Sequence, residues 1–284
     1  MPIHRTLLLA RLAALAALAL LTFGAAYASD TTVVVKGELK GSWRLPDAAW
    51  DGRAVILLHG FADDMDGAGD LSKHLTEVLA QRGIASLRIN FRGEGDRKRT
   101  VIESTFLSRI QDTEAAYEFL IRQSGARNGH LGCIGWSLGA ATEAEILGRH
   151  PLWFRTGVLW STLPGDLQKF MMTLPGAAAA VRDGVSTYDA GWKKITTYRA
   201  FYESFSGIDL NRSIGLYPGA LLTVRGSLDF VPNVDPELMR LAPGLPREAI
   251  LIGGADHTFN VLGPDKSASE RAVRVTADWL VRTL

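Results

Sequence analysis

Short apolar runs alternate with amphipathic segments along most of the chain, and this alternation constrains its fold more than any other feature. The runs predict strands over 32–35, 37–44, 53–60, 84–93, 130–136, 156–162, 219–226 and 248–254. Helical spacing falls between them, over 70–83, 105–123, the segment after 137 and 266–284. Parallel strand neighbours need a crossover, which a helix usually provides. We therefore expect an α/β fold with a mostly parallel sheet, covered by helices on both faces, and an antiparallel start.

Residues 163–217 interrupt the alternation. They contain no clear parallel strand, yet they are rich in large side chains such as Phe170, Trp192 and Phe201. A structureless loop of this length is uncommon inside a compact domain. We expect a small helical insertion over one end of the sheet. Its aromatic side chains fit two interpretations equally well, the insertion's own core or the wall of an apolar acyl pocket.

The first 28 residues differ from the rest of the chain. Arg5 and Arg11 give a positively charged start, residues 12–23 carry no charge, and Ala26-Tyr27-Ala28 fits an A-x-A cleavage site. The apolar stretch is shorter than the roughly 20 residues that cross a bilayer. We expect a secretory signal peptide over residues 1–28, cleaved near Ala28. The mature domain, residues 29–284, is then exported (periplasmic or secreted) without a stable membrane span. An uncleaved anchor helix is the alternative.

Charge and cysteine content argue against several classes of protein. The formal net charge is +1 and no block of like charge occurs, so neither nucleic acid nor an anionic membrane is an expected partner. The single cysteine, Cys133, lies in an apolar run, where a buried thiol behaves as a small hydrophobe. No cluster of residues has metal-ligand spacing, so we expect neither a metal nor an organic cofactor.

Ser137 lies within Gly135-Trp136-Ser137-Leu138-Gly139, where an apolar run ends and a helix-favouring segment begins. One interpretation is a plain turn, because glycine and serine favour turns. The other is a nucleophile elbow, in which glycines make room for a tight turn that lifts the serine above the carboxyl edge of the sheet. The next helix would offer unpaired N–H groups to a developing negative charge. Such a serine needs a base and a third group that orients it.

Candidates for both groups follow in the chain order serine, acid, histidine. Asp229 and His257 come just after the last two predicted strands, so both emerge at the same sheet edge as Ser137. The other histidines lie in the first 28 residues, in or near helices, at the opposite edge of the sheet, or in the segment 57–64, which is considered below for an oxyanion hole. Asp166 is the alternative acid, and Asp229 also fits a plain turn role. Asp256 adjoins the histidine, which points its side chain elsewhere.

The segment LLHGFADD, residues 57–64, provides a further element. The N–H of Phe61, which follows His59 and Gly60 at a strand end, can pair with the N–H of Leu138 to form an oxyanion hole. One such donor contributes on the order of 10²–10³ in rate. A plain turn at Gly60 is the alternative.

Five ordered motifs, LLHGF, NFRGEGD, GWSLG, GSLDFVP and GADHTF, together resemble the α/β-hydrolases over residues 50–284. They are most similar to carboxylesterases of the cinnamoyl or feruloyl esterase type and to their acyl-peptide-hydrolase-like relatives. The resemblance implies a lid over residues 163–217 and a set of roles: nucleophile Ser137, base His257, acid Asp229, and oxyanion donors Phe61 and Leu138. The chain departs at Trp136, where many members carry His, and at Asp96, where Ser is common. We expect neither difference to touch the chemistry.

These observations predict a serine hydrolase that cleaves small-molecule carboxylic esters through an acyl-enzyme on Ser137. A peptidase or amidase on the same fold is the first alternative, because the triad is shared and the pocket selects the leaving group. A non-catalytic exported binding protein that keeps the fold is the second.

Overall fold

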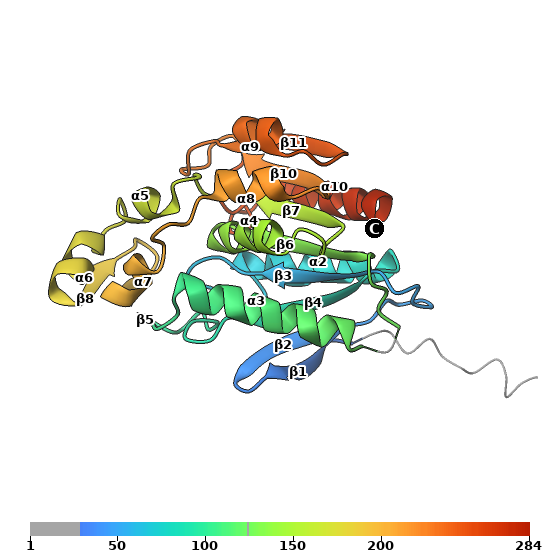
Figure 1. Ribbon diagram of the computed structural model, residues 1–284, viewed down its shortest axis with the longest axis horizontal. Coiled ribbons are helices and arrows are strands. Elements are labelled where there is room, and N and C mark those ends of the chain that lie inside the picture. The colour runs from blue at the N-terminus through green and yellow to red at the C-terminus, as the bar shows by residue number, and fades with distance from the viewer. Residues whose placement is uncertain (1–28, 124) are drawn as a thin grey trace, which may run out of the picture.

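The computed structural model describes residues 29–123 and 125–284, so the expected signal peptide over residues 1–28 lies outside the described residues. The main sheet has eight strands in the order β1-β2-β4-β3-β6-β7-β10-β11 (Figure 1). Their bounds are β1 (Thr31–Lys36), β2 (Leu39–Arg44), β3 (Ala54–Leu58), β4 (Ala85–Asn90), β6 (Leu131–Trp136), β7 (Thr156–Trp160), β10 (Ala220–Gly226) and β11 (Arg247–Ile252).

The pairing directions confirm the expected architecture. From β4 to β11 all neighbouring strands pair in parallel. Strand β2 pairs antiparallel with both β1 and β4, which gives the expected antiparallel start. The carboxyl ends of the parallel strands therefore meet at one edge of the sheet, where loops can bring distant residues together.

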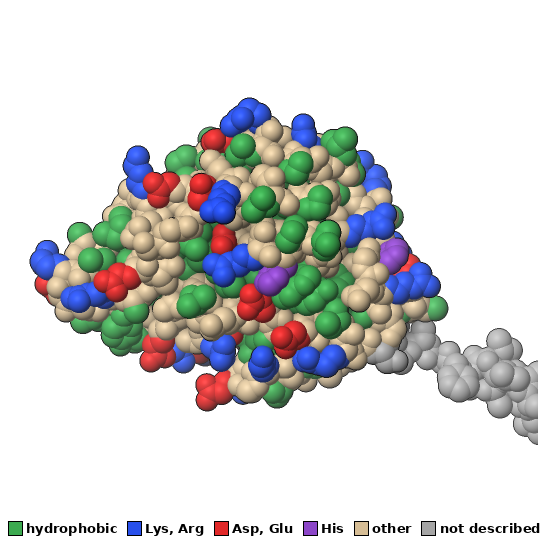
Figure 2. Space-filling view, in the orientation of Figure 1, with side chains coloured by type: hydrophobic (Ala, Val, Ile, Leu, Met, Phe, Trp, Pro, Cys, Tyr) green, Lys and Arg blue, Asp and Glu red, His purple; other side chains and the backbone are tan. Residues whose placement is uncertain are grey.

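Helices cover both faces of this sheet. Figure 1 shows α3 (Phe106–Ile121), α4 (Leu138–Arg149) and α8 (Leu210–Leu216) in front of it. Helices α2 (Leu71–Gln81) and α10 (Ser267–Thr283) pack against each other in the second hydrophobic core, on the opposite face. Basic and acidic side chains are interspersed on the face seen in Figure 2, which shows no large patch of one sign.

Strand β3 shows why its sequence is continuously apolar. All five of its residues are buried. Ala54, Ile56 and Leu58 belong to the core under α3 and α4, whereas Val55 and Leu57 belong to the core under α2 and α10. Each fully buried aliphatic side chain of this size contributes about 1.5–3 kcal/mol. A strand covered on both faces thus has no position for an exposed polar residue.

The insertion, residues 163–217, is only partly helical. It contains α5 (Leu167–Met171), α6 (Ala177–Asp183), a hairpin of β8 (Val185–Asp189) and β9 (Lys194–Tyr198), and α7 (Arg199–Glu203). Strand β9 also pairs with the short β5 (Val101–Ile102), and the insertion projects at the left of Figure 1. The hairpin strands are half exposed, so they show no continuous apolar run. The final helix, α8, packs on α4.

Several aromatic side chains of the insertion form its own core. Phe201, Tyr202 and Phe205 are buried, and the ring centroid of Phe205 lies 5.2 Å from that of Phe106 in α3. Trp192 is instead 62% exposed at the hairpin turn. Between residues 29 and 284, leaving aside residue 124, the structure contains no helix with the length and apolarity of a membrane span.

Helix α4 packs so closely on β3 that its first turn leaves no room for a side chain at Gly139. A Cβ atom there would lie 2.1 Å from the carbonyl oxygen of Leu58. A Cβ at Gly135 would lie 2.4 Å from the carbonyl oxygen of Gly139. The two glycines that flank Ser137 are therefore required by the close approach of backbones.

We predict that Gly139→Ala lowers the free energy of unfolding by about 3 kcal/mol, because backbone atoms must move to relieve the overlap with Leu58. The matched control is Gly215→Ala in α8, where the added methyl meets open space. This control should be neutral or gain up to about 1 kcal/mol from helix propensity. Urea unfolding measures both, and equal stabilities for the two variants would contradict the prediction.

Candidate active site

Ser137 occupies a strained turn between β6 and α4. Its φ of 55° and ψ of −119° lie outside the conformations that non-glycine residues usually adopt. Such a backbone costs on the order of 1–3 kcal/mol and persists only when its surroundings fix it. Here the Ser137 N–H donates to the carbonyl of Trp160 at 2.9 Å, and the close contacts of Gly135 and Gly139 hold both sides.

The structure brings Ser137, His257 and Asp229 together at the carboxyl edge of the sheet. The imidazole Nε2 of His257 lies 3.0 Å from Ser137 Oγ, and its Nδ1 lies 2.7 Å from Asp229 Oδ1. A carboxylate only accepts hydrogen bonds, so Nδ1 carries the proton and Nε2 can accept from the serine hydroxyl. The arrangement is that of a nucleophile, a base and an orienting acid.

Asp229 is held as a carboxylate. Its side chain is 1% exposed, and it accepts from the N–H of Val231 at 2.9 Å and from Arg225 at 3.2 Å. Burial raises the pKa of Asp229, but the hydrogen bond and charge of His257 and the Val231 N–H outweigh this and leave the pKa below its usual value. An ionised Asp229 can stabilise a positively charged His257.

Arg225 is a site residue that the sequence motifs did not reveal. It lies in β10, is buried, and donates to Asp229, to Asp235 and to the carbonyl of Thr162 at 2.6 Å. These bonds fix the second oxygen of Asp229, which His257 does not contact. The available signal was a charged residue inside the apolar run ALLTVRG, four positions before the acid.

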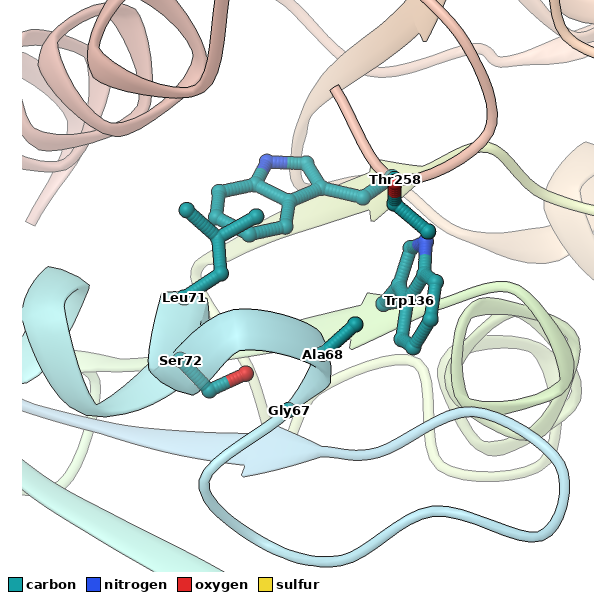
Figure 3. Close-up of a pocket in the computed structure, with 7 residues that line it drawn as sticks. Gly67, Ala68, Leu71, Ser72, Trp136 and Thr258 are labelled. Carbon is teal, nitrogen blue, oxygen red and sulfur yellow. The ribbon is translucent and has the colours of Figure 1, made fainter. Parts of the chain in front are cut away.

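Trp136 also contacts the site, so the expectation that this difference lies away from the chemistry is wrong. Its indole N–H donates to the carbonyl of His257 at 3.0 Å, and the two ring centroids lie 5.5 Å apart. Figure 3 shows a small pocket beside this tryptophan, lined by Gly67, Ala68, Leu71, Ser72, Trp136, Trp160 and Thr258. Ser137 is not among the residues that line this pocket.

The β3 loop, residues 59–62, runs directly beside Ser137. A Cβ built on Gly60 would lie 3.5 Å from the Cβ of Ser137. In the part of the chain that the structure describes, the N–H of Phe61 donates to no protein acceptor. Leu138 is the first residue of α4, and an N–H at this position has no partner within its helix. Two donors therefore flank the serine, as an oxyanion site requires.

His59 supports the β3 loop from inside. Its Nδ1 donates to the carbonyl of Gly60 at 2.7 Å, and its Nε2 accepts from the N–H of Phe91 at 3.1 Å. Burial lowers the pKa of His59 to about 4, so the ring is neutral at pH 7. Nearby, burial raises the pKa of Asp63 to about 6.

The alternative site residues lie elsewhere. Asp166 caps α5 by accepting from the N–H of Lys169 at 3.0 Å. Asp256 accepts from the N–H groups of Thr258 and Asn260, both at 2.8 Å. Cys133 is fully buried in β6, and burial raises the pKa of its thiol well above the usual value. In the structure it is Asp229 that contacts His257.

The two buried groups near the β3 loop affect stability in opposite directions. His59 binds a proton below pH 6.5 in the unfolded chain, but only below about pH 4 in the native chain. Between these two values protons favour the unfolded chain, so the free energy of unfolding decreases as the pH falls. Asp63 binds a proton below about pH 6 in the native chain, but only below 3.8 in the unfolded chain. Between these two values protons favour the native chain, so the free energy of unfolding increases as the pH falls. Each shift corresponds to about 3 kcal/mol.

We predict that single substitutions separate these contributions. As the pH falls from 6.5 to 4, the free energy of unfolding of His59→Gln should rise relative to that of the wild type, because only the Asp63 effect remains. Over the same fall in pH, the free energy of unfolding of Asp63→Asn should decrease relative to that of the wild type, because only the His59 effect remains. Urea unfolding at four or more pH values measures the slopes, and parallel profiles for the two variants would contradict the assignment.

Comparisons with known proteins agree with this architecture. A family profile described as "Serine aminopeptidase, S33" matches residues 52–185. A search of curated proteins finds no significant match. Many solved structures match this chain.

Three of these structures illustrate the likeness. Est1E from Butyrivibrio proteoclasticus, solved with ferulic acid bound, is 15% identical with a TM-score of 0.74, over 89% of this chain and 98% of its own. An esterase domain from a Rhodothermus marinus protein is 18% identical with a TM-score of 0.65, over 89% and 98%. A dienelactone hydrolase from Anabaena variabilis is 15% identical with a TM-score of 0.58, over 91% and 99%.

Such identities establish the fold and do not extend to the substrate. The sheet order, the strand-to-helix turn at Ser137 and the profile match converge on one assignment. The chain has the α/β-hydrolase fold.

Proposed function

We propose that this protein is a serine hydrolase that cleaves carboxylic esters through an acyl-enzyme on Ser137. The observation that carries the proposal is the hydrogen-bonded series from Ser137 Oγ through the His257 imidazole to the Asp229 carboxylate. Its geometry lets one residue attack, a second take the proton and a third stabilise the resulting charge. Among the similar structures, one is named an esterase domain and another holds ferulic acid, a carboxylic acid, and both support an ester as the substrate class.

In the first step, Ser137 Oγ attacks the ester carbonyl carbon as His257 Nε2 takes the hydroxyl proton. The carbonyl oxygen gains negative charge and accepts from the N–H groups of Phe61 and Leu138. The carbon–oxygen bond to the alcohol then breaks, and the imidazolium returns its proton to the leaving oxygen. The products of this step are a free alcohol and an acylated Ser137.

In the second step, water attacks the acylated serine. His257 takes a proton from the water and returns it to Ser137 Oγ as the acyl bond breaks. The carboxylic acid leaves, and the starting hydrogen bonds re-form. Asp229, fixed on its other side by Arg225, keeps the imidazole in one orientation through both steps.

Apolar side chains border the reacting groups and support an ester with an apolar or aromatic part. Phe230 is 75% exposed, and its ring centroid lies 4.5 Å from that of His257. Leu228, on the same loop after β10, is also exposed. An exposed phenylalanine against the proposed base offers a surface on which an aromatic acyl or alcohol group can pack.

We predict that Ser137→Ala lowers kcat for a short p-nitrophenyl ester on the order of 10⁴-fold or more, because no other group replaces the nucleophile. A fluorophosphonate probe should label the wild type and not this variant. The control is Ser206→Ala, an exposed serine of the insertion, which should keep both activity and labelling. Turnover or labelling of Ser137→Ala at the wild-type level would refute the proposal, and an unlabelled wild type would favour a non-catalytic binding protein.

A peptidase is the second candidate, because the matching family profile is named for a serine aminopeptidase. Turnover of three substrates distinguishes an esterase from a peptidase. Two of them, a p-nitrophenyl ester and a p-nitroanilide, carry the same acyl group, and the third is an aminoacyl p-nitroanilide. An esterase should hydrolyse the ester and show no detectable anilide turnover. A kcat/KM for either anilide that equals or exceeds that for the ester would favour the peptidase.

We also propose, from the sequence of residues 1–28, that the protein is exported and cleaved near Ala28. We predict that the full chain, expressed in a secretion-competent bacterial host, yields exported protein whose intact mass lacks those residues. Substitution of Ala26 and Ala28 by Gln should block this cleavage, because the site requires small side chains. Full-length protein confined to the membrane fraction would instead support an anchor helix.

A further inference from the structure

Lys193 connects the insertion to the β3 loop. It lies in the hairpin turn immediately before β9, and its ammonium group donates to three carbonyl oxygens. These belong to Ala62 at 2.6 Å, Arg99 at 3.0 Å and Arg97 at 3.3 Å. The first carbonyl follows Phe61 in the β3 loop, and the other two belong to the loop after β4. One side chain thus joins three segments that are distant in sequence.

The surroundings of this ammonium group indicate a specific contact. Lys193 is half-buried, and among the described residues it forms no ion pair with a carboxylate. Burial lowers the pKa of Lys193, although the more distant charges of Asp63 and Glu94 oppose the change. A desolvated cation without a paired anion costs free energy unless other hydrogen bonds replace its water. The three carbonyls provide that replacement.

In the described part of the chain, the other polar contacts of the β3 loop backbone come from residues outside the insertion. Arg109 donates to the carbonyl of His59 at 2.5 Å, and the ring of His59 donates to the carbonyl of Gly60. The carboxylate of Glu94 accepts from the N–H of Ala62 at 3.0 Å. Among the residues that the structure describes, the carbonyl of Ala62 is the one backbone group around Phe61 that the insertion holds.

The side chain of Phe61 makes a second contact with the insertion. Its ring centroid lies 5.1 Å from that of Phe201 in α7, which is buried. The insertion therefore contacts the phenylalanine ring and also holds the carbonyl of the next residue. Displacement of the hairpin would release the Ala62 carbonyl while leaving the Glu94 and Arg109 contacts in place.

We propose that Lys193 is a positioning residue that steadies the β3 loop by holding the carbonyl of Ala62, and thereby keeps in place the Phe61 N–H, whose own peptide His59 orients through the Gly60 carbonyl. The loop that carries the Phe61 N–H is then held on all sides only when the hairpin is docked, so the insertion contributes to turnover. This inference rests on the proposed function. Lys193 touches neither the substrate nor the reacting atoms and acts through the backbone of the β3 loop.

The test compares Lys193→Met with the matched control Lys194→Met, whose exposed lysine lies at the adjacent position. For a soluble p-nitrophenyl ester, Lys193→Met should lower kcat about 10-fold or more, since a fully lost donor costs on the order of 10²–10³. KM should change less than kcat, and Lys194→Met should match the wild type. Lys193→Arg keeps the charge and the donors, so it should retain a higher kcat than Lys193→Met.

Hydrogen–deuterium exchange provides a readout that needs no activity. Amides of residues 60–65 should exchange faster in Lys193→Met than in Lys194→Met, with equal melting temperatures and equal exchange in α4. Unchanged exchange would overturn the role of Lys193 in fixing the loop. Faster exchange with an unchanged kcat would overturn its role in turnover. An inactive, unlabelled wild type would refute the proposed esterase, while exchange would still decide whether Lys193 holds the loop.

Discussion

The close approach of helix α4 to strand β3 determines where Ser137 lies. Gly139 lets the first turn of α4 approach the backbone of β3, and Gly135 lets β6 approach that same turn, both more closely than any side chain would allow. That contact supports the unfavourable φ of the serine and places its hydroxyl beside His257. It also brings the loop after β3, with the Phe61 N–H, against the same turn. This close packing thus sets the positions of Ser137, the proposed nucleophile, and of the N–H groups proposed for its oxyanion.

Buried ionic groups fix the two loops that border the serine. Glu94 and Arg109 form a fully buried pair beneath the β3 loop. Burial raises the pKa of Glu94, but the charges of Arg109 and His59 together with the hydrogen bonds from Ala62 and Ser104 outweigh it and leave the pKa below its usual value. Arg225 serves the loop after β10 in a similar way. Buried pairs add little net stability, but loss of one partner costs about 3–5 kcal/mol. Their value here is geometric, because each charged side chain binds specific backbone or carboxylate oxygens.

Much of the architecture could be predicted because its signals are local. Strands buried on both faces appear as apolar runs, and their carboxyl ends meet at one edge, which placed Ser137, Asp229 and His257 together in advance. The β8–β9 hairpin was missed because its half-exposed strands alternate polar and apolar residues. The contact of Lys193 with Ala62 spans 131 positions and leaves no local pattern. The choice between Asp229 and Asp166 likewise required three-dimensional positions, since both follow predicted strands.

The enclosure of Cys133 within β6 has a practical consequence. The chain has no other cysteine, and this thiol is buried and remains protonated at neutral pH. Maleimide chemistry on the folded protein would therefore find no native target. A cysteine engineered on an exposed part of the insertion could carry a fluorophore at one defined place, and its emission would report on the surroundings of that place alone.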